Sequence, residues 1–599
     1  MEFSTAGKLW HLMSRAQRRS AIGLVGFMLV GSVLETLGVG LVVPVLVVMS
    51  QSNPVERFPQ LAAVLGPFAN SSQSELLTAV MVVLVVTYAV KAAYLVYVTW
   101  RQARFVFALQ VSLSRRLFEE YLHQPYTFHL QRNSAQLMRN VVTETSQFSH
   151  VATIPGLTLL SDGLVLLGIG ALLLAIEPLG ALIVMATIGS AGFAYHRLTQ
   201  ARVLRWGEAR QLHEGMRIQH LQQGLGGAKE VKLLGRELQF VEQYTVHDIG
   251  VARVQERQLT LQALPRIWLE LLGVTGLAAL VLTMLSQGRP IEALVPTLGM
   301  FAAAAFRLMP SMSKVLASIQ SLRYAQPVID TLKSELSQLN RERVAQPVSS
   351  FTFHKTLQIE GLSYSYPESN GMALRDIALE IRHGTSVGIV GGSGAGKSTL
   401  IDVVLGLLIP SSGAVRVDGR DIHSNLRGWQ NEIGYVPQVI YLTDDTLRSN
   451  VAFGLAPHQI DEAAVWRALR AAQLEEFVSQ LPAGADTIVG ERGVRLSGGQ
   501  RQRIGIARAL YHDPAVLVLD EATSALDTET ERGVMEAVRA LQGEKTILII
   551  AHRTSTVEHC DVIVRLAQGS IVAVGDPEMM LPSMSTASAD TATNSVRSS

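Results

Sequence analysis

The sequence predicts an all-α membrane domain of six transmembrane helices followed by an α/β domain. Three observations predict this fold class. Hydrophobic residues make up 48% of the 599 residues and charged residues only 17%, whereas soluble domains carry about a quarter charged residues. The apolar residues gather in roughly the first half of the chain. In the second half, short β-rich runs alternate with helical patterns, which is typical of a mostly parallel sheet covered by helices.

Six apolar segments approach or exceed the roughly 20 residues that a helix needs to cross a bilayer. Their approximate bounds are 21–49, 77–100, 151–176, 179–196, 264–286 and 292–316. Two long polar stretches, 101–150 and 197–260, carry helical patterns between these segments. The predicted domains are a transmembrane domain at 1–330, a linker at 331–349, an α/β domain at 350–581 and a disordered tail at 582–599.

Lysine and arginine residues indicate how the chain is oriented in the membrane. They crowd the N-terminus and both long polar stretches, whereas the opposite connections contain only Arg57 and Arg289. Cytoplasmic loops carry the excess of these residues, so both termini are predicted to be cytoplasmic. The formal net charge of +1 argues against a nucleic-acid partner. The single cysteine, Cys560, excludes an intramolecular disulfide.

The segment 391–399, GGSGAGKST, lies between a strand-like and a helix-like run. Its spacing G-x-x-x-x-G-K-[ST] is that of the phosphate-binding P-loop. The glycines of such a loop turn backbone N–H groups toward one anion, and the following helix adds its positive dipole. Lys397 is predicted to neutralise the β- and γ-phosphates, and Ser398 to bind Mg²⁺. The predicted nucleotide contacts are Gly391, Gly392, Ser393, Gly394, Ala395, Gly396, Lys397, Ser398 and Thr399.

A second candidate element is the run VLVLDE at 516–521, predicted to be a buried strand that ends in two acids. Asp520 is suited to be a direct or water-mediated partner of Mg²⁺, and Glu521 is placed to polarise the attacking water. Alone, the same run would be an ordinary strand followed by a solvated acidic turn. The P-loop upstream favours the nucleotide site.

Between these two elements stands Leu496-Ser497-Gly498-Gly499-Gln500, which resembles the signature of ABC-type ATPases. Further motifs follow the order of that family over the whole of 350–580. Tyr366 resembles the aromatic residue that stacks on adenine, and Gln438 resembles the glutamine that touches Mg²⁺ and water. His552 resembles the histidine that contacts the γ-phosphate, and Asp527 ends a segment that resembles the loop reaching across the dimer.

The resemblance implies a site made by two chains, with ATP and Mg²⁺ as its cofactors. In this family the P-loop of one nucleotide domain faces the signature segment of another. The resemblance therefore implies that Ser497, Gly498, Gly499 and Gln500 contact the nucleotide of a second chain. One chain carries one set of motifs, so a homodimer with two competent sites is predicted. The implied catalytic residues are Lys397, Gln438, Glu521 and His552, and the implied Mg²⁺ partners are Ser398, Gln438 and Asp520.

Charged residues within the apolar segments are the clue to cargo, because each costs about 2.5–3.5 kcal/mol at the bilayer centre. They are Glu35, Lys91, Asp162, Arg266, Glu270 and Arg307. One interpretation pairs Arg266 with Glu270 at i,i+4, and Lys91 or Arg307 with Glu35 or Asp162. The other places Arg266 and Arg307 of two protomers in a cavity for an anionic headgroup, with Glu35 and Lys91 as further candidates. Both interpretations stay open.

The membrane half, with its helical extensions ahead of the nucleotide domain, resembles that of ABC exporters. The stretches near 126–137 and 221–236 look like the short helices that seat into the nucleotide domain. Four fragments resemble bacterial flippases for lipid-linked oligosaccharides of the N-glycosylation type: VLETLGVGLVVPVL (33–46), GAKEVKLLGRE (227–237), LPRIWLELLGV (264–274) and AAAAFRLMPSMSKV (302–315). In that group, cavity arginines are implicated in handling the lipid's pyrophosphate.

These resemblances favour ATP-driven flipping of a polyprenyl-pyrophosphate-linked oligosaccharide, or another anionic lipid, across the bacterial cytoplasmic (inner) membrane. A general lipid, multidrug or peptide exporter is the alternative transport function. A channel gated by ATP would show the same motifs. A soluble ABC ATPase of DNA repair or translation is excluded by the six apolar segments.

Overall fold

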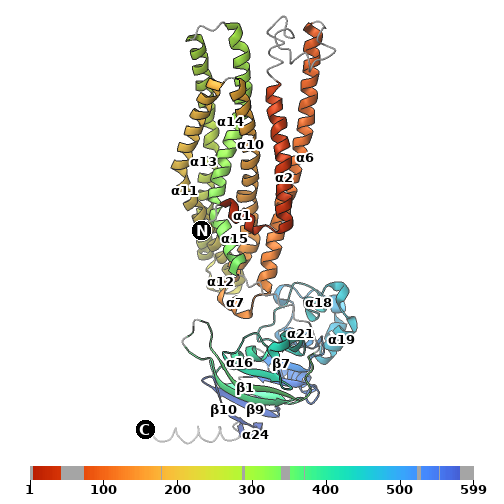
Figure 1. The fold of residues 1–599 in the computed structure, drawn as a ribbon. Coiled ribbons are helices and arrows are strands. Elements are labelled where there is room, and N and C mark those ends of the chain that lie inside the picture. Colours follow the sequence, from red (N-terminus) through yellow and green to blue (C-terminus); the bar gives the residue numbers. More distant parts are fainter. Residues whose placement is uncertain are drawn as a thin grey trace, which may run out of the picture. The chain divides into compact units, whose positions relative to one another are not determined.

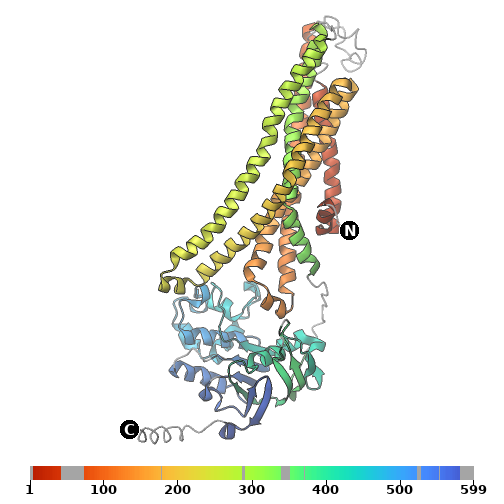
Figure 2. The same ribbon diagram turned by 90° about the vertical axis from the view of Figure 1, so that its left-hand side faces the viewer.

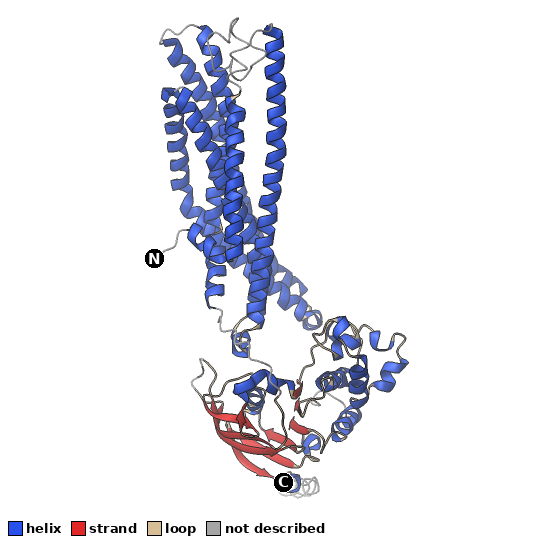
Figure 3. Ribbon diagram, turned by 45° about the vertical axis from the view of Figure 1, so that its right-hand side comes forward, coloured by secondary structure: helices blue, strands red, loops and turns tan. Residues whose placement is uncertain are grey.

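The protein is described from a computed structural model that covers residues 5–41, 73–176, 178–286, 291–338, 351–367, 369, 371–522, 528–551 and 553–580. The chain divides into two compact units, Met1–Gln124 with Phe128–Arg341, and Glu342–Ser599 with the short segment Pro125–Thr127. Figure 3 shows that the described part of the first unit is helical and that the strands lie in the second. The predicted fold class is confirmed.

Long helices that run side by side form the described part of the first unit (Figure 1). Helix α10 packs against α2 and α14, α2 packs against α6, and α11 packs against both α13 and α14. The bounds are α1 Thr5–Leu12, α2 Arg15–Gly40, α6 Gln73–Leu122, α7 Tyr126–Gln131, α8 Ser134–Arg139, α9 Thr145–Gln147, α10 Ile154–Ile176, α11 Pro178–Gly226, α12 Ala228–Leu234, α13 Glu237–Ser286, α14 Ile291–Tyr324 and α15 Gln326–Gln338. Two π-helical segments, Asn140–Glu144 and Phe148–Thr153, flank α9.

Three helical stretches of the described residues are long and apolar enough to cross a membrane: Arg15–Gly40, Leu77–Leu122 and Ser134–Ala175. They contain the described parts of the first three predicted segments, apart from Leu41 and Ile176 at two of the ends. The other three predicted segments lie within α11, α13 and α14, where some side chains fall outside the description. Residues 42–49 of the first predicted segment also lie outside it.

The two polar stretches predicted to be helical continue the apolar helices. Helix α6 runs on to Leu122, and α11 runs on to Gly226 before α13 begins at Glu237. Figure 2 shows α11 and α13 as two long neighbouring helices whose far ends are joined at α12. Helix α12 ends at Leu234, and the next residue, Gly235, has a φ of 61°, the left-handed conformation that favours glycine at a helix C-terminus.

The predicted linker at 331–349 is wrong in its first part, because α15 continues to Gln338. Its buried side chains Val328, Leu332 and Leu336 recur every four residues and pack in a core cluster with Leu109 and Leu113 of α6. This spacing places them on one face of the helix. Most other residues of the segment are polar, so the sequence did not indicate this apolar face. Residues 339–349, like the predicted tail at 582–599, lie outside the described residues.

The described part of the second unit contains two sheets, of strand order β2-β1-β4-β5 and β10-β9-β3-β8-β7-β6. The first is antiparallel, and in the second only the β10–β9 pair is antiparallel. The strands are β1 Thr356–Tyr364, β2 Leu374–Arg382, β3 Ser386–Gly391, β4 Ser412–Val417, β5 Arg420–Asp421, β6 Ile433–Val436, β7 Val516–Asp520, β8 Thr546–Ile550, β9 Val562–Ala567 and β10 Ser570–Gly575. The helices are α16 Lys397–Val404, α17 Leu426–Asn431, α18 Leu447–Val451, α19 Glu462–Ala471, α20 Glu475–Gln480, α21 Gly498–Leu510, α22 Thr528–Arg539, α23 Thr554–Val557 and α24 Pro577–Met580.

Three adjacent strands of the larger sheet, β3, β8 and β7, correspond to the runs SVGIVG, TILII and VLVLD. Parallel strands covered on both faces are apolar on both faces, and the side chains of β8 are buried throughout. Because β3 and β7 lie on either side of β8 in parallel register, their carboxyl ends point the same way. The P-loop after β3 and the acids at the end of β7 therefore lie at one edge of the sheet.

Candidate nucleotide site and membrane charges

The loop between β3 and α16 has the backbone conformation of an anion cradle. Gly394 and Gly396 have φ of 75° and 99°, in the left-handed region that side chains disfavour. A Cβ on Gly396 would lie 2.8 Å from the Ala373 carbonyl oxygen, so the position has no room for a larger residue. Buried Lys397 donates from Nζ to the carbonyl oxygens of Gly391 and Gly392, at 3.0 and 3.1 Å. Its ammonium group is thus held over the loop.

Asp520, at the end of β7, lies near Lys397 of this loop, and Glu521 follows it. Burial raises the pKa of Asp520, and the neighbouring Glu521 raises it further, while the charge of Lys397 opposes the rise. Tyr435 of β6 donates from its hydroxyl to Asp520 at 3.4 Å. Glu521 has a φ of 48°, a conformation that is rare for residues other than glycine and recurs at functional sites. Two crowded carboxylates beside one lysine fit a divalent cation held by hard oxygen ligands.

Gln438 lies beside the acid predicted to orient water. Its side-chain amide donates to the Glu521 carboxylate at 2.7 Å. Together with the charge interaction between Lys397 and Asp520, this bond brings four of the predicted site residues into one cluster. The sequence places them 124 positions apart, from Lys397 to Glu521. The parallel pairing of β3, β8 and β7 brings these residues together in space.

Tyr366 follows β1 and stands next to α16. Its hydroxyl lies 3.1 Å from the Thr399 hydroxyl, and its ring meets that of Tyr364 edge-on at 5.0 Å between centroids. Tyr366 is therefore anchored next to the P-loop helix, where an aromatic face is available to a planar base.

Asp402 lies one turn beyond Ser398 in α16 and interacts electrostatically with Asp520. It was not among the site residues predicted from the sequence. Burial raises its pKa to about 6, and Asp520 contributes to the rise. The signal that could have found it is its position at i+4 from Ser398, on the same face of the helix.

Asp402→Asn is expected to stabilise the nucleotide-free protein at pH 7.5 by about 1–2 kcal/mol, after discounting for partial exposure. A raised pKa means that ionised Asp402 destabilises the fold, so this penalty grows from about pH 4, near the unfolded pKa, and approaches its full value above pH 6. The stability difference between variant and wild type should accordingly be several-fold smaller at pH 4 than at pH 7.5. Denaturant unfolding at both pH values measures it, with the exposed Asp444→Asn as control. An equal difference at both pH values would contradict the assignment.

The signature segment begins helix α21. Ser497 caps the helix: its hydroxyl accepts from the Gln500 backbone N–H at 3.2 Å, and the Gln500 side chain accepts from the Ser497 N–H at 2.8 Å. Ser497 and Gly498 are exposed while Gly499 is buried. A helix N-terminus with exposed small residues presents free N–H groups and a positive dipole. The segment thus offers a second anion-binding element on the surface of this unit.

Two predicted site residues, Asp527 and His552, lie outside the described residues. The structure describes the strand β8 that precedes His552 and the helix α22 that begins at Thr528. Their roles remain predictions.

The membrane charges are paired in the structure. Arg307 of α14 makes two hydrogen bonds to the Glu35 carboxylate of α2, at 2.8 and 3.0 Å, and Lys91 of α6 lies 2.7 Å from the same carboxylate. Glu35 is buried at 5% exposure. Arg266 bonds Glu270 at 3.1 Å, with both side chains largely exposed.

The remaining membrane acid, Asp162, lies on α10. It accepts a hydrogen bond from Ser311 at 2.8 Å, and Lys314 stands 3.9 Å away. Every charged residue that the sequence analysis singled out in the membrane segments therefore has a partner. The geometry therefore agrees with the interpretation that these charges pair with one another. Glu35 is the partner of both Arg307 and Lys91, Glu270 is the partner of Arg266, and Asp162 lies near Lys314.

A P-loop beside a buried acidic strand, joined to a bundle of membrane-crossing helices, defines a multi-pass membrane protein that couples ATP hydrolysis to transport. Comparison with known proteins identifies the family. Residues 374–524 match the family model described as ABC transporter, and residues 21–289 match the one described as ABC transporter transmembrane region. The chain belongs to the ABC transporter family, and within it is a half-transporter with one membrane domain fused to one ATPase domain.

Similar proteins include two named ATP-dependent lipid A-core flippase. That of Nitrosococcus oceani is 32% identical over 473 residues, which cover 78% of each chain. That of Alkalilimnicola ehrlichii is 32% identical over 484 residues, which cover 78% of this chain and 79% of the relative. Among solved structures, a bacterial Atm1-family ABC exporter with ATP bound matches with a TM-score of 0.77 and 23% identity, over 95% of this chain and 97% of the other. That likeness concerns the fold.

Proposed function

We propose that this protein works as a homodimer that uses ATP to flip an anionic lipid across the bacterial inner membrane, with both termini in the cytoplasm. The finer proposal for the substrate is a polyprenyl-pyrophosphate-linked oligosaccharide. The relatives named lipid A-core flippase support a lipid substrate in general. A general lipid exporter would share the same architecture.

In the proposed ATPase cycle, Lys397 and the P-loop N–H groups hold the phosphates of ATP. Ser398, Gln438 and Asp520 would hold Mg²⁺, which neutralises charge that develops on the transferred phosphoryl group. Glu521 accepts a hydrogen bond from the attacking water and polarises it, and Gln438 fixes the orientation of the Glu521 carboxylate. His552 contacts the γ-phosphate.

The exposed N-terminus of α21 completes the site in the proposed dimer. Its capped end would bind the γ-phosphate of ATP held by a second chain, and Asp527 is the proposed contact to the second chain. Because closure needs nucleotide at this shared surface, ATP binding draws the two nucleotide domains together and hydrolysis releases them.

The observation that carries the substrate proposal is the charge balance around Glu35. Two cations, Arg307 and Lys91, share this one buried carboxylate, so the cluster has a net charge of +1. A positive charge among membrane helices is costly unless an anion approaches it. Arg307 is partly exposed, with 27% of its side chain accessible, and its planar fork suits a phosphate oxygen pair. Arg266, whose side chain is 79% exposed, is a second candidate contact.

We expect Arg307→Ala to abolish substrate stimulation of ATPase activity while basal hydrolysis survives. Glu35 keeps Lys91 as its partner in this variant, so the fold should tolerate the change. The measurement is the ATPase rate in lipid nanodiscs with and without a polyprenyl-pyrophosphate disaccharide, and separately with lipid A-core, for wild type, Arg307→Ala and Arg266→Ala. Exposed Arg253→Ala on α13 is the control. Stimulation of wild type by hydrophobic drugs or peptides alone would reject the lipid proposal.

A further inference from the structure

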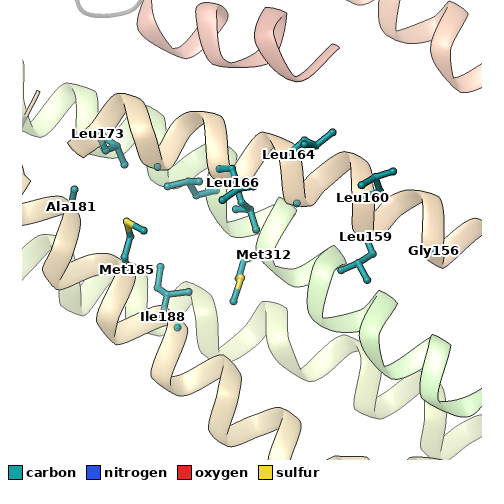
Figure 4. A pocket seen from close by; sticks show the side chains of 15 residues that line it. Gly156, Leu159, Leu160, Leu164, Leu166, Leu173, Ala181, Met185, Ile188 and Met312 are labelled. Atoms are coloured by element: carbon teal, nitrogen blue, oxygen red, sulfur yellow. The ribbon is translucent and has the colours of Figure 1, made fainter. Parts of the chain in front are cut away.

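Helix α11 changes in character along its length. Within the predicted membrane segment it turns Met185 and Ile188 toward the apolar space beside α10 and α14 (Figure 4). Beyond that segment it runs beside α13 (Figure 2) and carries His213 and His220. These histidines are seven residues, or about two turns, apart and therefore lie on one face of α11. The extension of α11 thus brings two imidazoles toward α13, outside the predicted membrane segments.

His247 of α13 contacts both of these histidines. Its Nδ1 lies 3.0 Å from the Nδ1 of His213, which is a hydrogen-bond distance. Its ring lies nearly parallel to that of His220, at 22° and 5.4 Å between centroids. Gly250, one turn further along α13, leaves room for the His213 ring, because a Cβ there would lie only 2.6 Å from the His213 Nδ1. The three imidazoles therefore join α11 to α13 at one place.

The contact between His213 and His247 has room for one proton between the two facing nitrogens. A neutral imidazole has one donor and one acceptor nitrogen, whereas a charged imidazole has two donors. One ring can be charged and still donate to its neutral partner. When both rings are charged, each facing nitrogen carries a hydrogen and no acceptor remains. The hydrogen bond is then replaced by repulsion between two like charges.

The carboxylates next to this contact already have arginine partners. Arg217 of α11 lies 2.7 Å from both Glu214 of α11 and Asp248 of α13. Buried Arg210, one turn before Glu214, lies 3.1 Å from Glu144. These acids are therefore engaged by arginines and are poorly placed to neutralise a second charged imidazole.

The other groups that helices bring near this part of α11 and α13 are cationic or uncharged. They are Arg139 of α8, Lys232 of α12, Tyr244 of α13, Tyr324 of α14 and Thr331 of α15. Lys232 is bound to Glu237 at 3.0 Å. Burial raises the pKa of Tyr324 to about 12, so its phenol stays neutral. None of these five side chains stabilises a positive charge on the histidines by an opposite charge of its own.

The surroundings of His247 oppose its protonation. Burial lowers the pKa of His247, and the neighbouring His213 and His220 lower it further. His220 adds no compensating hydrogen bond from its Nδ1, which is buried without a partner. A lowered pKa means that charged His247 destabilises the folded contact. The contact is therefore strongest above the ordinary pKa of about 6.5 and weakens as the pH falls below it.

We propose that His213, His220 and His247 form a proton-sensitive contact that holds α11 against α13 at neutral pH and releases it at acid pH. The contact lies close to α12, which joins the two helices and belongs to the stretch predicted to seat into a nucleotide domain. Its release loosens the support of α12, so ATPase activity falls as the solution around α12 becomes acidic. This inference goes beyond the proposed function and does not depend on which substrate is carried.

The test measures amide hydrogen exchange of the full-length protein in lipid nanodiscs at pH 7.5 and 5.5, with rates corrected for the pH dependence of exchange itself. In wild type, protection of peptides covering 209–226 and 237–251 should fall about three- to tenfold at pH 5.5. His213→Asn should remove most of this fall, because an amide can either donate to His247 or accept from it. His247→Asn repeats the test from α13, should His213→Asn misfold.

His123→Asn on α6 is the matched control, since it removes an exposed histidine outside the cluster and should respond to pH as wild type does. Equal wild-type protection at both pH values would overturn the inference, as would an undiminished fall in both cluster variants. Among the described residues, no group of three or more His, Cys, Asp or Glu side chains is arranged to hold a metal ion. EDTA at pH 7.5 should accordingly change nothing, and a loss of protection on its addition would show that a metal ion joins the rings instead.

The effect on activity is measured on the same samples as the ratio of basal ATPase rates at pH 5.5 and 7.5. This ratio should be about two- to tenfold higher in His213→Asn than in wild type or His123→Asn, because the variant keeps its contact in acid. If exchange responds as expected but the ratio is the same in all variants, the regulatory part of the inference is overturned. Basal hydrolysis needs no added lipid, so a failure of the proposed substrate leaves this result unaffected.

Discussion

Glu521→Gln is expected to lower ATP turnover by about 10²–10⁴-fold, the range that a general base contributes, while ATP binding persists. The amide keeps the size of the side chain and its position beside Gln438, but it cannot polarise water as a carboxylate does. The dimer should therefore close around ATP and remain closed. Steady-state ATPase activity measures the first effect, and retention of radiolabelled ATP after gel filtration measures the second.

The control for this variant is Glu360→Gln on β1. Glu360 pairs with Arg416 at 2.9 Å, and both side chains are exposed. Exposed ion pairs contribute little to stability, so turnover should stay at the wild-type rate. Wild-type turnover in Glu521→Gln would show that another group polarises the water, and it would return Glu521 to a structural role at the end of β7.

The parts of this protein that the sequence predicts well are those in which a few consecutive residues define a local geometry. The P-loop is one example, because Gly394 and Gly396 supply left-handed conformations that the turn itself requires. The run 516–519 also predicts its own structure, because four consecutive apolar residues favour a strand that is buried on both faces. The cap of α21 by Ser497 and Gln500 is likewise readable from a spacing of three residues.

Pairings over long sequence separations could not be predicted in the same way. The sequence allowed Lys91 and Arg307 to pair with either Glu35 or Asp162. The packing of α2 against α6 and α14 places both cations beside Glu35. The open space beside Gly163, where a Cβ would meet no heavy atom within 4 Å, is a still clearer case, since a glycine in an apolar helix predicts close packing as readily as open space. Asp402 also needed the fold, because burial sets its pKa.

Removing Glu35 should strongly destabilise the first unit, because this buried carboxylate is shared by two cations. Glu35→Ala leaves Arg307 and Lys91 facing each other without their shared carboxylate. Breaking a buried ion pair by deleting one partner costs about 3–5 kcal/mol, because the remaining charge stays desolvated. Here two cations remain, so we expect a loss at the upper part of that range. The measurement is thermal or denaturant unfolding of the protein in lipid nanodiscs.

A second substitution separates electrostatics from packing. Adding Arg307→Ala to Glu35→Ala removes one of the stranded cations and should recover part of the lost stability, giving a coupling energy that a packing defect alone would not produce. Glu270→Ala is the comparison, because its partner Arg266 is largely exposed and the pair should contribute less than about 1 kcal/mol. If the double variant is less stable than Glu35→Ala alone, packing around Arg307 stabilises the cluster more than its charge destabilises it. The argument that the net positive charge is costly without an anionic lipid would then be rejected.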